Sequence, residues 1–296
     1  MKEYWVVQNE NLHPQNQKIL NEYLMSIWIQ NMSKYTIMYR SWFLQNFLLF
    51  INKPVTNLTS DDILNWINEK CSDLKETTIN WRLTVLSSFI KFCQEEEQKY
   101  IDESVRIKKH WRPKIPKPLP KYRDEEELAR MNIAAEKQNL RDRTIYEFSI
   151  SSGCRVGEVS GLEIEKVDLK NRTAIVVGKG KKVRQVHFNE KSAMLLEKLL
   201  ENHPEGASTV FLNRFGKKMH ERSFQNIIAK IGKKAGLLTK LTPHQLRHTF
   251  ATVKLNKGAD LVFISDELGH SSLRTTGIYA RVLDERITEL YRKYMG

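Results

Sequence analysis

The sequence predicts a mainly α-helical protein with a small antiparallel β-sheet, divided into two domains. Helical periodicity runs through the first hundred residues, a basic and proline-rich stretch follows, and beyond it one pair of alternating apolar runs appears. These three observations place a four-helix domain at 1–112, a linker at 113–123 and an α+β domain at 124–296. The length of 296 residues suits two ordinary domains.

Four amphipathic segments make up the expected first domain. Ser33 can cap the second segment, and Ser60 with two aspartates after it suits the start of the third, because carboxylates are favoured at a helix N-terminus. The segments, with the apolar residues that share a helix face and are expected in the core, are 14–32 (Ile19, Tyr23, Ile27, Trp28), 33–51 (Tyr35, Tyr39, Phe43, Phe47, Phe50), 61–71, and 76–97 (Ile79, Leu83, Leu86, Ile90, Cys93).

The charge of the chain favours a polyanionic partner. There are 48 Lys and Arg against 35 Asp and Glu, which leaves a net charge of +13 and indicates nucleic-acid binding. Polar and basic residues that fall off the apolar helix stripes can face DNA, namely Arg40, Asn80, Arg82 and Lys91.

The stretch 105–123, VRIKKHWRPKIPKPLPKYR, combines four of the eight prolines with eight Lys or Arg and no acidic residue. Prolines at this density hold a chain extended and prevent a helix. An extended basic segment suits a linker that follows a phosphate backbone, and a basic linker that touches nothing is the alternative. The cations expected to contact DNA are Lys108, Lys109, Arg112 and Lys114.

Several classes of protein are excluded. The sequence has no apolar run near the ~20 residues of a membrane span, and its first residues do not have the pattern of a signal peptide. Three widely spaced cysteines (Cys71, Cys93, Cys154) fit a reducing cytoplasm better than a disulfide framework or a metal site. Without a phosphate loop or an acidic cluster, we expect a cytoplasmic protein that needs no nucleotide and no metal.

The second domain opens with Asp124 and three glutamates, which predict a helix start, and a further helix runs from Arg141 towards Ser151. Two glycines then bracket Arg155. Two alternating apolar runs flank the basic stretch 178–181 and predict a β-hairpin with Lys179 at its tip. Helices are expected over 190–201 and 221–235.

The segment 241–250, LTPHQLRHTF, starts another helix, since Thr242 can cap it and Pro243 suits its first position. His244 and Arg247 then share one face. A zinc-protease helix would need Glu after the first histidine, and this chain has Gln245 there, so a metal site is disfavoured. An imidazole beside a guanidinium instead suits an anionic oxygen.

Five motifs in order resemble those of the tyrosine recombinases, the phage integrase and Xer family. They are Gly153-Cys154-Arg155-Val156-Gly157-Glu158, Gly178-Lys179-Gly180, His244-Gln245-Leu246-Arg247-His248, Leu268-Gly269-His270 and Ile278-Tyr279. The resemblance of the catalytic region spans roughly 145–282. It implies a four-helix (SAM-like) core-binding domain followed by an α+β catalytic domain, in a simple Xer-like or transposon-resolvase layout without an additional arm-binding domain.

The resemblance also implies a catalytic set. Arg155 and Arg247 would hold the scissile phosphate, with His244 and His270 as further donors and His244 as a possible acceptor of the tyrosine proton. Tyr279 would attack the phosphate, and Lys179 would protonate the leaving oxygen. His248 is expected only to brace its helix from behind.

The expected partners are double-stranded DNA with inverted-repeat half-sites and three further copies of the chain in a homo-tetramer, with no membrane. The segment after Tyr279 has an apolar stripe that would pack on a neighbouring copy, or in cis as the alternative. Two rivals remain at this stage: a type IB topoisomerase, which reseals the same strand, and a non-catalytic DNA-binding protein on the same scaffold. Dimer resolution, cointegrate resolution and integration all use this layout.

Overall fold

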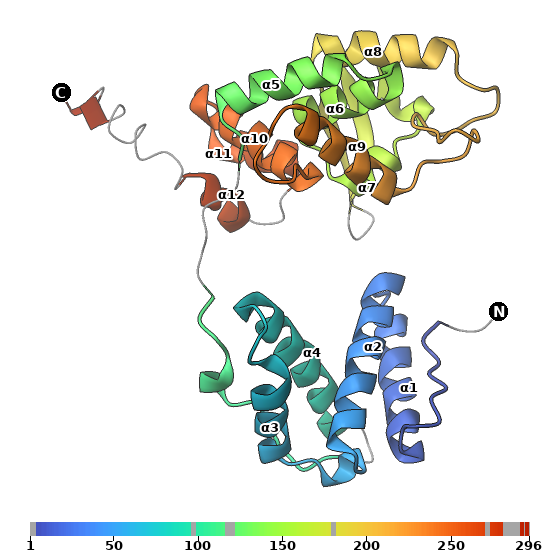
Figure 1. The fold of residues 1–296 in the computed structure, drawn as a ribbon, viewed down its shortest axis with the longest axis vertical. Helices are drawn as coiled ribbons and strands as arrows, with labels where there is room; N and C mark the ends of the chain where they lie inside the picture. Colours follow the sequence, from blue (N-terminus) through green and yellow to red (C-terminus); the bar gives the residue numbers. More distant parts are fainter. Residues whose placement is uncertain are drawn as a thin grey trace. The chain divides into compact units, whose positions relative to one another are not determined.

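The computed structural model of the chain describes residues 4–95, 99–115, 122–178, 182–269, 273–280, 291–292 and 294–295. Internal contacts divide the chain into two compact units, 1–117 and 118–296 (Figure 1). The domain and linker boundaries expected from the sequence stay a prediction. Within the described ranges, every helix is either too short or too polar to cross a bilayer.

The first unit is a bundle of four α-helices: α1 (Pro14–Ile29), α2 (Lys34–Ile51), α3 (Ser60–Cys71) and α4 (Glu76–Glu95), with short 3₁₀ turns at Val55–Asn57 and Lys109–Trp111. Local chemistry sets the helix starts as expected. The Ser33 hydroxyl accepts a hydrogen bond from the Thr36 amide at the start of α2. At α3 the cap is one residue earlier than expected, because Thr59 and Asp62 form a reciprocal capping box.

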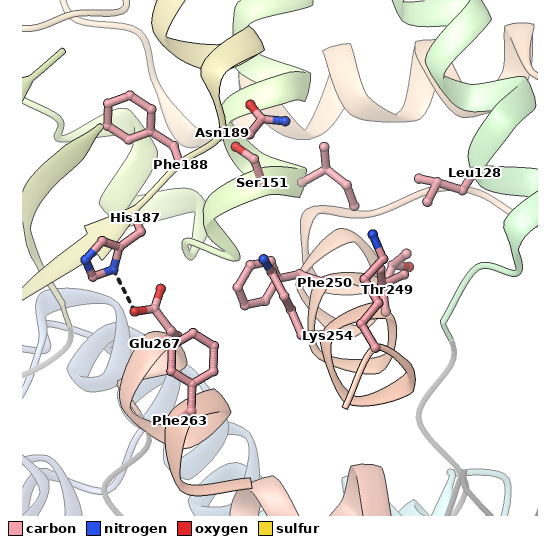
Figure 2. A pocket seen from close by; sticks show the side chains of 13 residues that line it. Leu128, Ser151, His187, Phe188, Asn189, Thr249, Phe250, Lys254, Phe263 and Glu267 are labelled. Atoms are coloured by element: carbon pink, nitrogen blue, oxygen red, sulfur yellow. Dashed lines mark hydrogen bonds and ion pairs between the residues drawn. The ribbon is translucent and has the colours of Figure 1, made fainter. Parts of the chain in front are cut away.

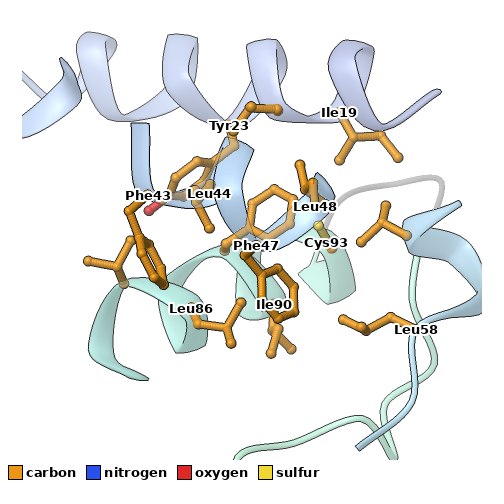
Figure 3. Packing of buried hydrophobic residues seen from close by; sticks show 14 of the residues in the cluster. Ile19, Tyr23, Phe43, Leu44, Phe47, Leu48, Leu58, Leu86, Ile90 and Cys93 are labelled. Carbon is orange, nitrogen blue, oxygen red and sulfur yellow. The ribbon is translucent and has the colours of Figure 1, made fainter. Parts of the chain in front are cut away.

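The core of this unit takes residues from all four helices, and Figure 3 shows the part to which α1, α2 and α4 contribute. Ile19, Tyr23, Phe43 and Phe47 are buried, as the sequence predicted. Tyr35 and Tyr39 are not: they are 75% and 61% exposed. The inward face of α2 instead carries the residues Ile37, Leu44 and Leu48 together with Phe43 and Phe47.

This correction has a simple cause. Apolar residues occur all around α2, so the spacing of its aromatic residues alone does not select which face is buried. Trp28 of α1, also expected in the core, is 39% exposed and stacks on Trp5. The predicted aromatic stripes are therefore only partly core.

The second unit packs helices around one small sheet. Its elements are α5 (Glu125–Glu136), α6 (Leu140–Ser152), α7 (Val156–Ser160), a 3₁₀ turn (Ile164–Lys166), β1 (Val167–Asp168), β2 (Thr173–Val177), β3 (Val183–His187), α8 (Glu190–Glu201), α9 (Glu221–Lys234), α10 (Pro243–Asn256), α11 (Leu261–Leu268) and α12 (Leu273–Ala280). The sequence predicted α5, α6, β2, β3, α8, α9 and α10. It did not predict α7, the 3₁₀ turn, the two-residue β1 or α11, and it left the segment around Tyr279 open as a loop or a short helix.

The sheet is antiparallel with the order β1-β2-β3, and the predicted hairpin is formed by β2 and β3. Its register pairs Val176 with Arg184 and Ala174 with Val186. Because side chains alternate along a strand, these four residues lie on the face that meets the helices, where Ala174, Val176 and Val186 are buried. Arg184 is thus a cation on the core face of the sheet.

Candidate active site

The first element of the site is the turn between α6 and α7. Gly153 ends α6 with φ of 62°, a left-handed conformation that favours glycine. The chain then places Arg155 at the start of α7, with its side chain 39% exposed. Both its backbone amide and its Nη1 donate to the carboxylate of Glu158, at 2.8 and 2.9 Å. A buried carboxylate therefore orients this half-exposed guanidinium.

The second element is α10, which begins as the sequence predicted. Thr242 and Gln245 form a reciprocal capping box, and Pro243 is the first helical residue. Arg247 is 3% exposed and donates to two carbonyls, those of Gly153 at 2.8 Å and Leu268 at 2.5 Å. Burial and then the charge of Arg155 lower the pKa of Arg247 to about 10, which still leaves it charged at neutral pH.

The third element joins α10 to α12 through Tyr279. Its hydroxyl lies 2.7 Å from Nδ1 of His248, and the tyrosine side chain is only 2% exposed. His244 stacks edge-on against His248, with ring centroids 4.3 Å apart. The expectation that His248 braces the helix from behind is wrong, since His248 is the histidine that contacts the tyrosine. The i to i+4 spacing shows only that the two histidines share a helix face, so it does not identify which of them contacts the tyrosine.

Burial, and after it the nearby positive charges, determine the protonation states of the site. Burial first, then the charges of His244 and Arg247, lower the pKa of His248 to about 4. Burial and the two arginines also lower the pKa of His244. Burial raises the pKa of Tyr279, although both arginines pull it down. At neutral pH a neutral His248 therefore faces a neutral phenol, and Nδ1 can accept the hydroxyl hydrogen.

Two members of the predicted catalytic set, Lys179 and His270, lie outside the described residues. Their neighbours Gly178 and Gly269 lie close to Arg155. A Cβ built on Gly178 would be 3.0 Å from Glu158 Oε1 and 3.9 Å from Arg155 Nη1. Gly269 offers its carbonyl to Arg155 Nη2 at 3.3 Å. The structure thus brings together Arg155, His244, Arg247 and Tyr279.

Two residues of the site were missed in the sequence. Glu158 stands within a motif but is given no role, although a glutamate three residues after the N-cap residue of a helix can accept a hydrogen bond from the amide of that residue, here Arg155. Arg184 carried a different signal: it is a charged residue at an inward position of an alternating strand. Such a residue needs a buried partner, and that partner is the Glu158 carboxylate, 2.8 Å away.

The candidate DNA-binding residues of the first unit are mostly engaged within it. Arg40 donates to the Tyr23 hydroxyl at 2.8 Å, Arg82 donates to the Lys70 carbonyl at 3.0 Å, and Arg112 donates to Asn80 at 3.1 Å. Lys91 pairs with Glu95 on the surface, and Lys108 lies over the Trp111 ring. Lys109 and Lys114 are exposed. Their contact with DNA stays a prediction.

Groups of three or more His, Cys, Asp or Glu side chains able to hold a metal ion do not occur among the described residues. The described polar groups of the site are instead arginines, histidines, the Tyr279 phenol and the Glu158 carboxylate, which is already paired with Arg155 and Arg184. Such a set offers cations and hydrogen-bond donors to an anionic oxygen.

Comparison with known proteins agrees with this arrangement. The model of the phage integrase family matches residues 121–286. Tyrosine recombinase XerC of Oceanobacillus iheyensis is 32% identical, over 89% of this chain and 91% of the relative. Tyrosine recombinase XerC of Halalkalibacterium halodurans is 35% identical, over 74% of this chain and 75% of the relative.

Two solved recombinase structures are also similar to this chain. XerA recombinase is 29% identical with a TM-score of 0.55, covering 93% of this chain and 99% of XerA. XerH bound to its difH substrate in a pre-cleavage complex shares the fold, with a TM-score of 0.74 and 22% identity over 96% of this chain and 94% of XerH.

The fold and the site together define a tyrosine recombinase, an enzyme of site-specific DNA recombination. The chain belongs to the phage integrase family. This membership favours recombination over the two rival functions considered from the sequence.

Proposed function

We propose that the chain cleaves and rejoins duplex DNA through a covalent bond between Tyr279 and the 3′ phosphate at the break. The position of the Tyr279 hydroxyl carries this proposal. It lies 2.7 Å from His248 in a buried cluster, where the charges of Arg247 and Arg155 act on it. A phenol placed beside a neutral base and two fixed cations is suited to attack an anionic phosphorus centre.

The proposed reaction needs no nucleotide, because the energy of the broken phosphodiester is kept in the new one. The Tyr279 oxygen bonds to phosphorus as the bond to the 5′ oxygen breaks. The tyrosine proton passes to His248, whose Nδ1 is nearest, and Lys179 gives a proton to the leaving oxygen. Attack by a 5′ hydroxyl of a partner duplex reverses these steps.

The remaining site residues stabilise charge on the phosphate. As the tyrosine attacks, negative charge grows on the two non-bridging oxygens, and Arg155 and Arg247 supply cations fixed in advance. The hydrogen bonds to Glu158, Gly153 and Leu268 leave further guanidinium hydrogens for a phosphate, since each guanidinium has five. His244 and His270 serve as further donors.

The proposed substrate is double-stranded DNA with inverted-repeat half-sites. A net charge of +13 supports a polyanionic partner. Solved structures with this fold include XerH bound to its difH substrate, a lambda integrase dimer bound to a core site and the Tn1549 transposon integrase in complex with a circular intermediate DNA. We place the reaction in the cytoplasm, which suits the three buried thiols.

We propose that four copies assemble on DNA, each giving its C-terminal segment to a neighbour. A cavity of ≈ 360 Å³ between α5, α6, α10 and α11 supports a docking site (Figure 2). Phe250 and Phe263 line it, and Lys254 and Lys257 supply positive charge. The C-terminal segment has apolar residues that could fill this cavity, since its sequence contains Ile287 and Leu290, and Tyr291 and Met295 are exposed.

Covalent trapping on a nicked suicide substrate tests the proposed chemistry. The Tyr279→Phe variant should bind the site normally and form no protein–DNA adduct. Tyr146→Phe is the matched control, because Tyr146 is another buried tyrosine of the same unit whose hydroxyl donates to Asn132 at 2.8 Å. Adduct formation by Tyr279→Phe at the wild-type rate would make another residue the nucleophile.

A further inference from the structure

The C-terminal turn of α11 is held by three arginines from three different elements. The carbonyls of residues 267, 268 and 269 accept hydrogen bonds from Arg184, Arg247 and Arg155, respectively. The last carbonyls of a helix lack intrahelical partners and carry partial negative charge, so guanidinium groups are favoured there. The two candidate phosphate-binding arginines therefore share this helix end with Arg184.

Arg184 also shares a carboxylate with Arg155. Glu158 Oε2 accepts from Arg184 Nη2 at 2.8 Å, and Oε1 accepts from Arg155 Nη1 at 2.9 Å. The Glu158 side chain is 2% exposed and that of Arg184 is 13% exposed. One buried carboxylate thus fixes the distance between the two guanidinium groups.

The packing around Gly269 shows how closely Arg184 lies against the end of α11. A Cβ at Gly269 would be 2.5 Å from Arg184 Cδ and 2.8 Å from its Nε. Gly269 also has φ of 59°, a conformation that side chains rarely adopt. Arg184 Nε is buried without a hydrogen-bond partner among the described residues, and both terminal nitrogens are bonded. Arg184 is therefore not placed to bind a phosphate.

We propose that Arg184 is a positioning residue for strand cleavage. It acts by holding the C-terminal end of α11, up to Gly269, against the Glu158–Arg155 pair, and α11 precedes the helix that carries Tyr279. This inference rests on the proposed function, because it assumes that Arg155 and Tyr279 act on the same phosphate. Arg184 itself does not touch the DNA.

Single-turnover cleavage of the suicide substrate at saturating protein tests this inference. Arg184→Ala should cleave roughly 100-fold more slowly, because a displacement of about 1 Å at reacting groups costs this much. Its affinity for a single half-site should change less than about threefold. Gln185→Ala is the matched control: Gln185 lies on the opposite, exposed face of the same strand, and its loss should leave both quantities unchanged.

A pH profile separates positioning from mere structural support. Burial tends to raise the pKa of Glu158, but the charge and hydrogen bond of Arg184, then the backbone and side-chain hydrogen bonds from Arg155, hold it below its ordinary value. The other ionisable groups close to Glu158 are Arg247 and the Cys154 thiol. In Arg184→Ala, burial is less opposed, so Glu158 should protonate at higher pH. Cleavage by the variant should then fall on mild acidification where the wild type stays level.

Arg184→Lys keeps a charge beside Glu158 but cannot also reach the α11 carbonyl as a fork, so cleavage should be roughly 10-fold slow. If Arg184→Ala does not fold, the cleavage rate and pH profile of Arg184→Lys test the inference instead. Wild-type cleavage and pH profile in a folded Arg184 variant would overturn the inference, and so would an equal loss of DNA affinity and cleavage. An adduct that persists in Tyr279→Phe would instead refute the proposed nucleophile, whatever the Arg184 variants do.

Discussion

Acidification should destabilise the second unit through His248. Its pKa in the folded chain is about 4, against an ordinary value of 6.5, because it is buried and lies beside His244 and Arg247. Since the unfolded chain binds this proton more readily, the stability from a neutral His248 is complete above about pH 6.5. It is lost progressively as the pH falls towards 4.

The size of the effect follows from the same shift. The difference between the His248 pKa in the unfolded and the folded chain corresponds to roughly 3 kcal/mol of unfolding free energy, because each tenfold change in proton affinity is worth about 1.4 kcal/mol. The imidazole is partly exposed, so solvent screening reduces this, and we expect about 1–2 kcal/mol. The lowered pKa of His244 adds a loss in the same direction.

The chain offers a built-in way to separate its two units in this assay. All six tryptophans precede residue 112 and so lie in the first unit. Urea unfolding followed by tryptophan fluorescence reports the first unit, and circular dichroism reports both. Between pH 7.5 and 5, the transition without a fluorescence change should weaken by about 1 kcal/mol, because only roughly 60% of the full effect is reached at pH 5.

His248→Gln is the control, because its amide oxygen can accept from the Tyr279 hydroxyl but does not titrate. The variant should lose most of the extra pH dependence in the second unit and none in the first. Parallel pH dependences for wild type and variant would refute the assignment of this proton to His248.

Further predictions concern the proposed reaction and assembly. Lys179→Ala should cleave slowly on ordinary DNA and recover on a substrate with a bridging 5′-phosphorothiolate, which needs no general acid; equal defects on both would limit Lys179 to binding. Strand cleavage should persist in excess EDTA without ATP, and a loss that magnesium restores would contradict the mechanism. Deleting 284–296, most of which lies outside the described residues, should spare single half-site binding but abolish cooperative filling of the second half-site. Four cations of the basic stretch 105–123 are to be neutralised together, namely Lys108, Lys109, Arg112 and Lys114. Their loss should flatten the salt dependence of DNA binding by up to ~0.9 in log–log slope for each phosphate that the variant no longer neutralises. An unchanged slope would mean that the stretch only connects the two units.

Features that depend on neighbours along the chain could be predicted from the sequence alone. The start of α10 follows from Thr242, Pro243 and Gln245, since a cap is made by residues three apart. The pairing of β2 with β3 follows from the two alternating apolar runs on either side of the Gly- and Lys-rich stretch 178–181. The order of the motifs was enough to indicate the family, because it needs no knowledge of how they meet in space.

Contacts between side chains far apart in the sequence became known only from the packed structure. His248 reaches Tyr279 across 31 positions, and Arg184 reaches Glu158 across 26. Neither pairing follows from local spacing, because it depends on how α10, α12, α7 and β3 pack together. The exposure of Tyr35 was decided in the same way. A helix that is apolar on several faces buries the one its neighbours cover, and that choice is made by packing between helices.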